Sequence, residues 1–217
     1  ERLTFSTDRD ACAAQADFVI EAAVEDLSVK RSIFADLDRV CPPHSLLVTN
    51  SSNIVSSRVA DATGRPGKVC NLHFFNPAPM MSLVEIIAPL TASDATVEAV
   101  TAFASACGKD PVQVKDRAGF IVNALLIPFL FSAIRMLEAG HATKEDIDTG
   151  MINGCAHPMG PIRLADRVGL DTCFYVGQSI YEETGDPANK PPLLLSRMVD
   201  AGLLGVKSGQ GFYDYSR

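Results

Sequence analysis

Residues 71–87 read NLHFFNPAPMMSLVEII, two short apolar segments around a proline-rich turn. This pattern is typical of two strands that lie side by side. His73 lies inside the first segment and Glu85 inside the second. A buried carboxylate needs a partner, because removing an unpaired charge from water is costly. We therefore expect Glu85 to pair with His73; the alternative is a core histidine that a backbone carbonyl satisfies.

Such a pair is suited to proton transfer. A carboxylate that holds one ring nitrogen of His73 fixes the tautomer and makes the other nitrogen a better base. Buried charge pairs also occur for purely structural reasons, so both interpretations of His73 and Glu85 stay open at this stage.

Outward from this stretch, apolar strands and amphipathic helices alternate over the first half of the chain. The predicted strands are 3–7, 17–23, 45–49, the two of the opening stretch and 111–115, and the predicted helices are 8–15, 27–40 and 91–107. This alternation predicts an α/β domain with a parallel sheet. Polar residues follow three of the strands, at 21–25, at 50–52 and at His73, so we expect them at the sheet edge where ligands bind.

The composition changes after Lys115 and predicts an all-α domain. We expect domains at 1–115 and 116–217, the second beginning with one long helix over 119–139. That helix is apolar nearly all round, so other helices or a second subunit must cover it. Further helices are predicted from Thr143, from Pro161, over 171–183 and over 192–201, and the glycine-rich, aromatic tail is predicted to be a packed loop.

Four polar residues or pairs outside the opening stretch also stand out. Asn123 is an amide near the start of the apolar helix; it either patches the hydrogen-bond defect at Pro128 or faces a ligand across the domain boundary. Ser52 is one of several hydroxyl and amide candidates for a helix cap, so one hydroxyl is left for a ligand. From charge alone, the Glu25 and Lys30 pair, and likewise Lys207, are expected to be solvated surface groups.

Charge and cysteine usage exclude several functions. The 217 residues carry a net charge of −7 without a Lys/Arg block, which argues against a nucleic-acid partner. The six cysteines show no CxxC pair or zinc spacing, which argues against a metal site and favours reduced thiols in a cytoplasmic protein. The most apolar run, 119–134, is shorter than the ~20 residues of a membrane span.

Taken together, the motifs resemble the NAD-dependent L-3-hydroxyacyl-CoA dehydrogenase family, which includes the 3-hydroxybutyryl-CoA dehydrogenases. The resemblance extends over essentially the whole chain. In order, the motifs are DFVIEA (17–22) with Glu25, NSS (50–52), HFFNP (73–77), LVE (83–85), GFIVN (119–123), HPMGP (157–161), GLD (169–171) and GQGFY (209–213). Several motifs in one order are more specific than any one of them.

The resemblance implies a Rossmann-type sheet followed by an all-α domain, NAD as cofactor, an acyl-CoA substrate and a homodimer formed through the C-terminal helices. It implies catalytic roles for His73 and Glu85 and substrate contacts for Ser52 and Asn123. The cofactor contacts that it implies are Glu25, Lys30, Ser52, Asn76 and Lys207.

The chain departs from the family pattern in two places. It contains no GxGxxG turn between a strand and a helix, and the glycines nearest that spacing, Gly205, Gly209 and Gly211, lie in the tail. We therefore expect a sheet with an exposed apolar edge, and weak NAD binding and turnover by these 217 residues alone. Ser82 stands where many relatives have a lysine.

Two other functions remain as alternatives. One is a CoA-independent β-hydroxyacid dehydrogenase, whose usual lysine acid/base is not matched here, because no lysine occurs in the long helix before Lys144. The other is a non-catalytic, crystallin-like structural protein on the same fold.

Overall fold

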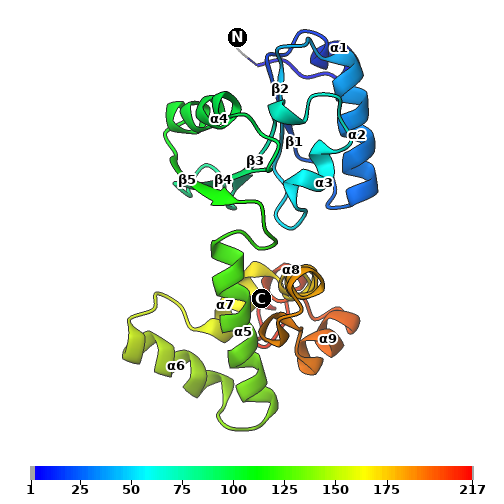
Figure 1. Cartoon of the computed structure of the whole chain (residues 1–217). Helices are drawn as coiled ribbons and strands as arrows, with labels where there is room; N and C mark the ends of the chain where they lie inside the picture. The colour runs from blue at the N-terminus through cyan, green and yellow to red at the C-terminus, as the bar shows by residue number, and fades with distance from the viewer. Residues whose placement is uncertain (1–2, 217) are drawn as a thin grey trace. The chain divides into compact units, whose positions relative to one another are not determined.

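The computed structural model describes residues 3–216, and the chain divides into two compact units between Phe120 and Ile121 (Figure 1). We call them unit 1 and unit 2. Asp116 belongs to unit 1, because its carboxylate accepts hydrogen bonds from the backbone N–H groups of Ser56 and Ser57, both at 2.7 Å.

Unit 1 is built on one sheet, in which the described strands follow the order β1-β2-β3-β4-β5. Their bounds are β1 (Phe18–Glu21), β2 (Leu46–Thr49), β3 (Val69–Phe74), β4 (Leu83–Ala88) and β5 (Asp110–Lys115). The prediction of parallel strands is confirmed for β1, β2 and β3. The proline-rich turn then reverses the chain, so β4 is antiparallel to β3 and β5 runs parallel to β4.

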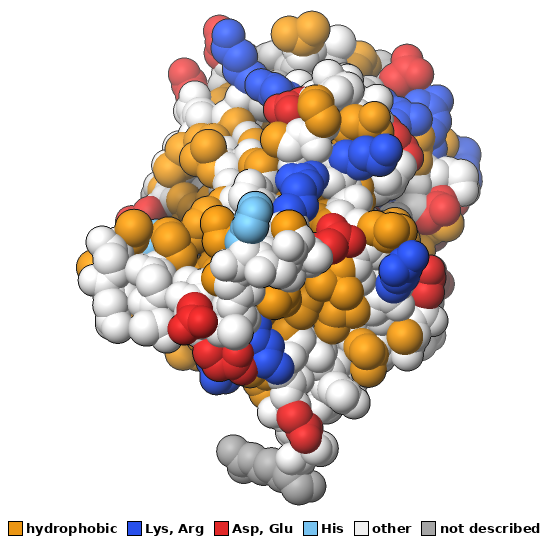
Figure 2. Space-filling model, turned by 90° about the horizontal axis from the view of Figure 1, so that it is seen from below, with side chains coloured by type: hydrophobic (Ala, Val, Ile, Leu, Met, Phe, Trp, Pro, Cys, Tyr) orange, Lys and Arg blue, Asp and Glu red, His pale blue; other side chains and the backbone are white. Residues whose placement is uncertain are grey.

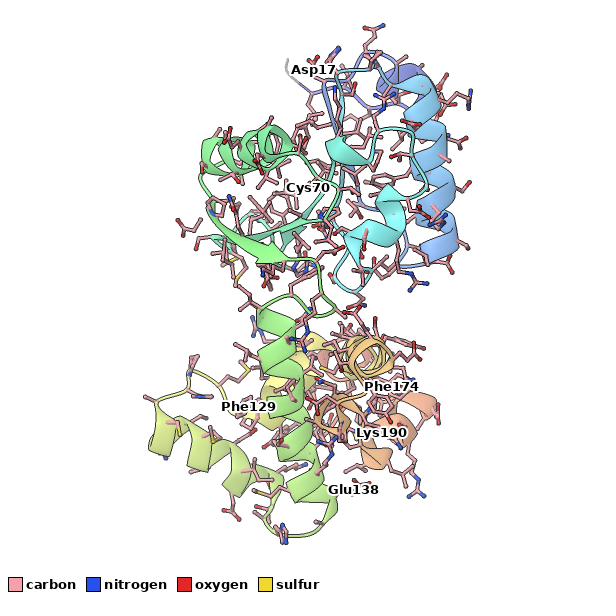
Figure 3. All side chains as sticks on the ribbon, viewed as in Figure 1. Asp17, Cys70, Phe129, Glu138, Phe174 and Lys190 are labelled. Atoms are coloured by element: carbon pink, nitrogen blue, oxygen red, sulfur yellow. The ribbon has the colours of Figure 1, made fainter. Side chains whose placement is uncertain are left out.

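Helices cover both faces of this sheet (Figure 1). Helices α1 (Arg9–Ala13), α2 (Leu27–Val40) and α3 (Ser56–Ala60) pack on one face against Leu47 and Val69. Helix α4 (Asp94–Ala106) packs on the other, where Cys70 lies fully buried (Figure 3). Neighbouring residues of a strand point to opposite faces, so each strand contributes alternate residues to the two cores.

The same alternation places a row of polar side chains on the α2 face of the sheet. Glu21 lies opposite Thr49 in the register of β1 and β2, and Thr49 lies opposite Asn71 in the register of β2 and β3. Two residues further along β3, His73 lies opposite Glu85. All five side chains are at most 5% exposed, so the polar row replaces apolar core at this end of the sheet.

Most helix boundaries in unit 1 follow the sequence signals. Helix α2 has the predicted bounds, and the Asp26 carboxylate caps it by accepting from Val29 N–H at 2.9 Å. Ser93 caps α4 as expected, and Gly108 beyond its end has a φ of 72°. The predicted strand at residues 3–7 is wrong, because those residues pair with no strand in the part of the chain that the structure describes.

Unit 2 is helical, with a short 3₁₀ turn, η2 (Pro187–Asn189), before its last helix. The helices are α5 (Val122–Glu138), α6 (Lys144–Cys155), α7 (Pro161–Val168), α8 (Leu170–Thr184) and α9 (Leu193–Asp200). Helix α5 begins later than predicted, because Gly119 and Phe120 have positive φ values of 78° and 49°. Its buried side chains include Leu130, Phe131 and Ile134.

The tail folds back onto α7, which confirms the expected packed loop. The buried Asp166 carboxylate accepts from the backbone N–H groups of Phe212 and Tyr213, both at 2.9 Å, and from the Tyr215 hydroxyl at 3.1 Å. A Cβ on Gly211 would lie 2.1 Å from Asp166 Oδ1 and one on Gly205 would lie 2.2 Å from the Asp166 carbonyl oxygen. Gly205 and Gly211 therefore serve the close packing of the tail on α7.

Candidate active site

His73 and Glu85 form a hydrogen-bonded pair inside unit 1, as predicted. The two residues are direct partners in the β3–β4 register, and His73 Nδ1 lies 2.9 Å from Glu85 Oε2. Their exposed fractions are 3% and 1%, and the Phe75 and Phe120 rings lie 4.7 and 5.3 Å from the imidazole. An ionised carboxylate can only accept, so this contact places the ring proton on Nδ1 and leaves the Nε2 lone pair for a donor.

Ser52 meets that second nitrogen. Its Oγ lies 3.0 Å from His73 Nε2, and the serine itself is partly exposed. The neighbouring Ser51 takes the local turn instead, because its Oγ accepts from Ile54 N–H at 2.9 Å. The expectation that one of these hydroxyls stays clear of capping is confirmed, and that hydroxyl is Ser52.

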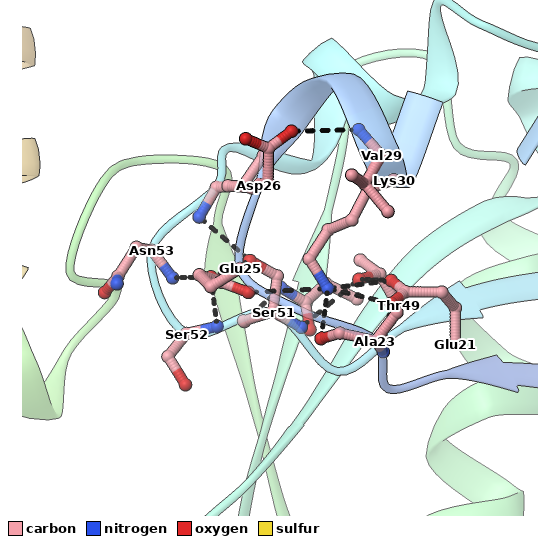
Figure 4. Close-up of polar contacts among 12 residues, drawn as sticks. Glu21, Ala23, Glu25, Asp26, Val29, Lys30, Thr49, Ser51, Ser52 and Asn53 are labelled. Carbon is pink, nitrogen blue, oxygen red and sulfur yellow. Dashed lines mark hydrogen bonds and ion pairs between the residues drawn. The ribbon is translucent and has the colours of Figure 1, made fainter. Parts of the chain in front are cut away.

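The loop that carries Ser52 is held by Glu25 (Figure 4). Glu25 Oε1 accepts from Ser52 N–H at 3.0 Å, from Asn53 N–H at 2.9 Å and from the Ser51 hydroxyl. Glu25 comes from the connection between β1 and α2, so one carboxylate joins the ends of two neighbouring parallel strands. This is the sheet edge where polar residues were expected to gather.

The expectation that Lys30 is a solvated surface group is wrong. Lys30 is 1% exposed, and its Nζ lies 2.8 and 3.0 Å from the two carboxylate oxygens of Glu21. It also lies 3.4 Å from Glu25 Oε2. The spacing of Lys30, Phe34 and Leu37 places the lysine on the buried face of α2, which is the sequence signal that would have revealed it.

The remaining predicted site residues lie elsewhere. Asn76 is exposed in the connection that follows β3 in unit 1. Asn123 lies in the first turn of α5 in unit 2, where it stays a predicted substrate contact. Lys207 is also in unit 2, in the 3₁₀ turn η3 (Val206–Ser208), where it donates to Asp171 Oδ2 at 2.6 Å. Lys207 is therefore paired as well as partly exposed.

Three buried polar residues beside the site were not predicted as site residues. Glu21 binds Lys30, Thr49 donates from its hydroxyl to Glu21 Oε2 at 2.7 Å, and Asn71 Nδ2 donates to the Ser51 carbonyl at 2.9 Å. Glu21 and Thr49 are the last residues of β1 and β2, and Asn71 lies within β3. The alternation of side chains along a strand can show that a polar residue lies on the buried face, which the amino-acid composition alone cannot show.

The described residues do not indicate metal chemistry, and the buried cysteine of β3 is not a reactive thiol. Residues 3–216 contain no group of three or more His, Cys, Asp or Glu side chains placed to hold a metal ion. Burial raises the pKa of the Cys70 thiol in β3 to about 12, which keeps it protonated at neutral pH. What the site offers is acid–base chemistry at His73.

Comparison with known proteins identifies the family. Residues 1–117 match the family model described as 3-hydroxyacyl-CoA dehydrogenase, NAD binding domain, and residues 119–215 match that of the 3-hydroxyacyl-CoA dehydrogenase C-terminal domain. The chain belongs to the 3-hydroxyacyl-CoA dehydrogenase family. The Glu85, His73 and Ser52 geometry thus lies in the nucleotide-binding part of a dehydrogenase.

Individual members of the 3-hydroxyacyl-CoA dehydrogenase family are closely similar. The chain is 51% identical over 215 residues to the 3-hydroxybutyryl-CoA dehydrogenase of Mycobacterium tuberculosis, covering 98% of this chain and 75% of the relative. It is 43% identical over 211 residues to the human mitochondrial hydroxyacyl-coenzyme A dehydrogenase, covering 97% and 67%. The crystal structure of (S)-3-hydroxybutyryl-CoA dehydrogenase from Ralstonia eutropha superimposes with a TM-score of 0.93 at 42% identity, over 98% of this chain and 75% of that one.

Proposed function

We propose that this dehydrogenase oxidises an L-3-hydroxyacyl-CoA to the 3-ketoacyl-CoA and that His73 is the base. The observation that carries the proposal is the buried contact series from Glu85 through His73 to Ser52, with 2.9 and 3.0 Å between the bonded atoms. NAD, when bound, supplies the acceptor for the hydride that leaves carbon 3. The proton of the 3-hydroxyl passes to a side chain of this protein.

The proton step takes place at His73 Nε2. The O–H bond of the 3-hydroxyl breaks, its proton passes to Nε2, and the oxygen becomes the new carbonyl as carbon 3 loses its hydride. The imidazole is then positively charged, and the buried Glu85 carboxylate at 2.9 Å stabilises it. In the reverse direction, the charged imidazole returns the proton to the carbonyl oxygen.

Ser52 and Asn123 are proposed as hydrogen-bond donors to the reacting oxygens. The Ser52 hydroxyl already lies at the atom that takes the proton, so a substrate hydroxyl bound beside it is directed at Nε2. Asn123 is assigned on the resemblance alone. For the cofactor we propose contacts from the Ser52 loop with Glu25, from Asn76 and from Lys207.

The experiment is reduction of acetoacetyl-CoA with NADH by the natural full-length protein, followed by loss of NADH absorbance. We expect turnover with the CoA thioester and none with free acetoacetate. Turnover of the free acid at a similar rate would favour the CoA-independent alternative. That alternative needs a lysine base, and Lys144 Nζ donates a hydrogen bond to the Phe212 carbonyl oxygen at 2.6 Å. No turnover of either compound would favour the non-catalytic alternative.

We also propose that the protein is a homodimer formed through unit 2. Figure 2 shows apolar side chains between charged ones on one face of the chain. Ile121, just before α5, is 40% exposed, and α5 exposes Leu125 (71%) one turn later and Met136 (46%) further along. Sedimentation equilibrium is expected to give twice the chain mass, and Leu125→Glu is expected to weaken the association. A monomer at micromolar concentration would contradict the proposal.

A further inference from the structure

Phe120 has a backbone conformation that its residue type does not favour. Its φ of 49° lies in the left-handed region, where a side chain crowds the neighbouring backbone. Among the described residues other than glycine, Ala156 shares this feature, with a φ of 55°. Ala156 is the C-cap of α6, a place where a left-handed residue ends a helix, but Phe120 comes before a helix and not after one. A cap therefore does not explain Phe120, and a strained residue that is kept is a reason to look for a function.

The turn that contains Phe120 brings its ring to the proposed base. Gly119 before it also has a positive φ, of 78°, and the Phe120 N–H donates to the Arg117 carbonyl oxygen at 3.1 Å, so the chain turns tightly beyond β5. Phe120 is only 5% exposed. Its ring centroid lies 5.3 Å from that of His73, with 60° between the ring planes. The strained turn therefore places an aromatic side chain against the imidazole.

The imidazole of His73 needs packing as well as its two hydrogen bonds to keep one orientation. The χ2 angle of a histidine has broad, two-fold preferences, and a half-turn of the ring would put carbon atoms where the nitrogens now meet Glu85 and Ser52. Two aromatic rings pack on the imidazole, Phe75 at a centroid distance of 4.7 Å and Phe120 at 5.3 Å. Phe75 is partly exposed, whereas Phe120 is buried. Phe120 is therefore the more closely held of the two rings.

We propose that Phe120 is a positioning residue for the reaction, because its ring holds the His73 imidazole in its hydrogen-bonded orientation. In that orientation Nδ1 faces Glu85 and Nε2 faces Ser52. The inference rests on the proposed function of His73 as the base. Proton transfer requires Nε2 and the substrate hydroxyl at hydrogen-bond distance, so a misaligned imidazole slows this step even when the substrate is bound. The strained backbone of Phe120 then has a purpose, because the ring reaches His73 from this turn.

Phe120→Ala in the natural full-length enzyme tests the proposal. We expect it to lower kcat about 10- to 100-fold, because the base is less often aligned, while the KM values for acetoacetyl-CoA and NADH stay within about threefold. Phe120→Leu restores most of the apolar volume beside the imidazole and is expected to bring kcat back to within about fivefold of the wild type. A wild-type kcat in Phe120→Ala, or a loss confined to KM, would overturn the proposal.

A double-mutant cycle shows whether the effect passes through the base. In a His73→Gln background, Phe120→Ala is expected to lower the remaining kcat less than about threefold, because the residue that it acts through is gone. The same loss in both backgrounds would show that Phe120 acts elsewhere and would contradict the proposal.

Phe103→Ala is the matched control for lost packing. The Phe103 ring stacks on Phe18, with 4.5 Å between the centroids, and both pack against the core on the α4 face of the sheet. Each Phe→Ala change removes a packed aromatic side chain from unit 1, so both variants are expected to lose stability in urea titrations followed by circular dichroism. The kcat of Phe103→Ala is expected to stay within about twofold of the wild type. Equal losses of kcat in the two variants would overturn the proposal.

Nuclear magnetic resonance of the histidine side chains provides a readout that needs no turnover. The chain has four histidines, and the signals lost in His73→Gln assign those of His73. In the wild type we expect the nitrogen chemical shifts of a single tautomer protonated at Nδ1, and in Phe120→Ala we expect that proton to exchange with water at least about tenfold faster. Phe103→Ala is expected to keep the wild-type rate, and an unchanged rate in Phe120→Ala would overturn the proposal. If the wild type does not reduce acetoacetyl-CoA, the proposed function fails, and the exchange rate still decides whether Phe120 orients the imidazole.

Discussion

Both units bury carboxylates, and they differ in what those carboxylates bind. In unit 1, Glu85 is 1% exposed and binds the ring of His73, whose other nitrogen meets the partly exposed Ser52. In unit 2, Asp148 is 4% exposed and accepts from Ile162 N–H at 2.8 Å and from Arg163 N–H at 3.1 Å. The first partner can change its charge, whereas backbone amides cannot.

Packing separates the two cases further. Asp148 also accepts from the Tyr213 hydroxyl at 2.9 Å, and a Cβ on Gly160 would lie 2.3 Å from its side chain. Asp166 is enclosed by Gly205 and Gly211 in the same way. Burial of a carboxylate therefore does not identify a catalytic site. A catalytic site is indicated when the partner of the carboxylate can titrate and a ligand can reach the other side of that partner.

The first and largest test of this contrast is His73→Gln. Glutamine cannot take the substrate proton, so we expect kcat for 3-hydroxyacyl-CoA oxidation to fall about 10³- to 10⁴-fold, while the fold stays intact. Steady-state kinetics of the natural full-length enzyme measure the fall, and circular dichroism checks the fold. His44→Gln is the matched control, because His44 is an exposed histidine of the same unit that pairs with Asp17. A His73→Gln variant that keeps more than a small fraction of the activity would show that another group is the base.

The second test compares Glu85→Gln with Asp148→Asn. An amide at position 85 can donate to Nδ1 and so stabilise the wrong tautomer of His73, which is expected to lower kcat about 10²-fold. The same carboxylate-to-amide change at Asp148 affects no residue that exchanges a proton with the substrate. Its kcat is expected to stay within about twofold, so equal losses for the two variants would remove the distinction between the carboxylates.

Much of unit 1 and the pairing of His73 with Glu85 follow from residue patterns, since apolar alternation predicts the strand positions and the pairing needs only two neighbouring strands. The ion pair of Lys30 with Glu21 does not follow from charge alone; the signal is the spacing of Lys30 from Phe34 and Leu37, which places the lysine on the buried face of α2. The later start of α5 was also hidden, since it depends on the positive φ of Phe120, which its residue type does not favour.

The third test addresses the structural carboxylate. Asp148→Asn loses one acceptor oxygen from the set that binds the start of α7 and Tyr213, so unit 2 is expected to lose roughly 1–3 kcal/mol of unfolding free energy. All four tyrosines (175, 181, 213 and 215) lie in unit 2, and the chain has no tryptophan, so tyrosine fluorescence follows the unfolding of this unit alone. Urea titrations that give equal midpoints for the wild type and the variant would contradict the assignment.

The last and smallest effect is a pH dependence at Asp166. Burial raises the pKa of this carboxyl above its ordinary 3.8, against the lowering by the Tyr213 and Phe212 N–H groups. The folded state therefore holds the proton more tightly than the unfolded state. The stability that Asp166 contributes is full below the unfolded pKa and is lost as pH rises through the folded pKa. The free energy difference between the wild type and Asp166→Asn, followed by tyrosine fluorescence, should thus fall as pH rises from about 4.

Asp214→Asn is the control of opposite sign in the same tail, because hydrogen bonds from the Ser216 hydroxyl and N–H lower the pKa of Asp214. For that exposed residue the difference should instead fall as pH drops below about 4, because the stability it contributes is present above the unfolded pKa and is lost as pH falls through the folded pKa. A fall of equal size in both would assign the pH dependence to general charge and not to burial at Asp166.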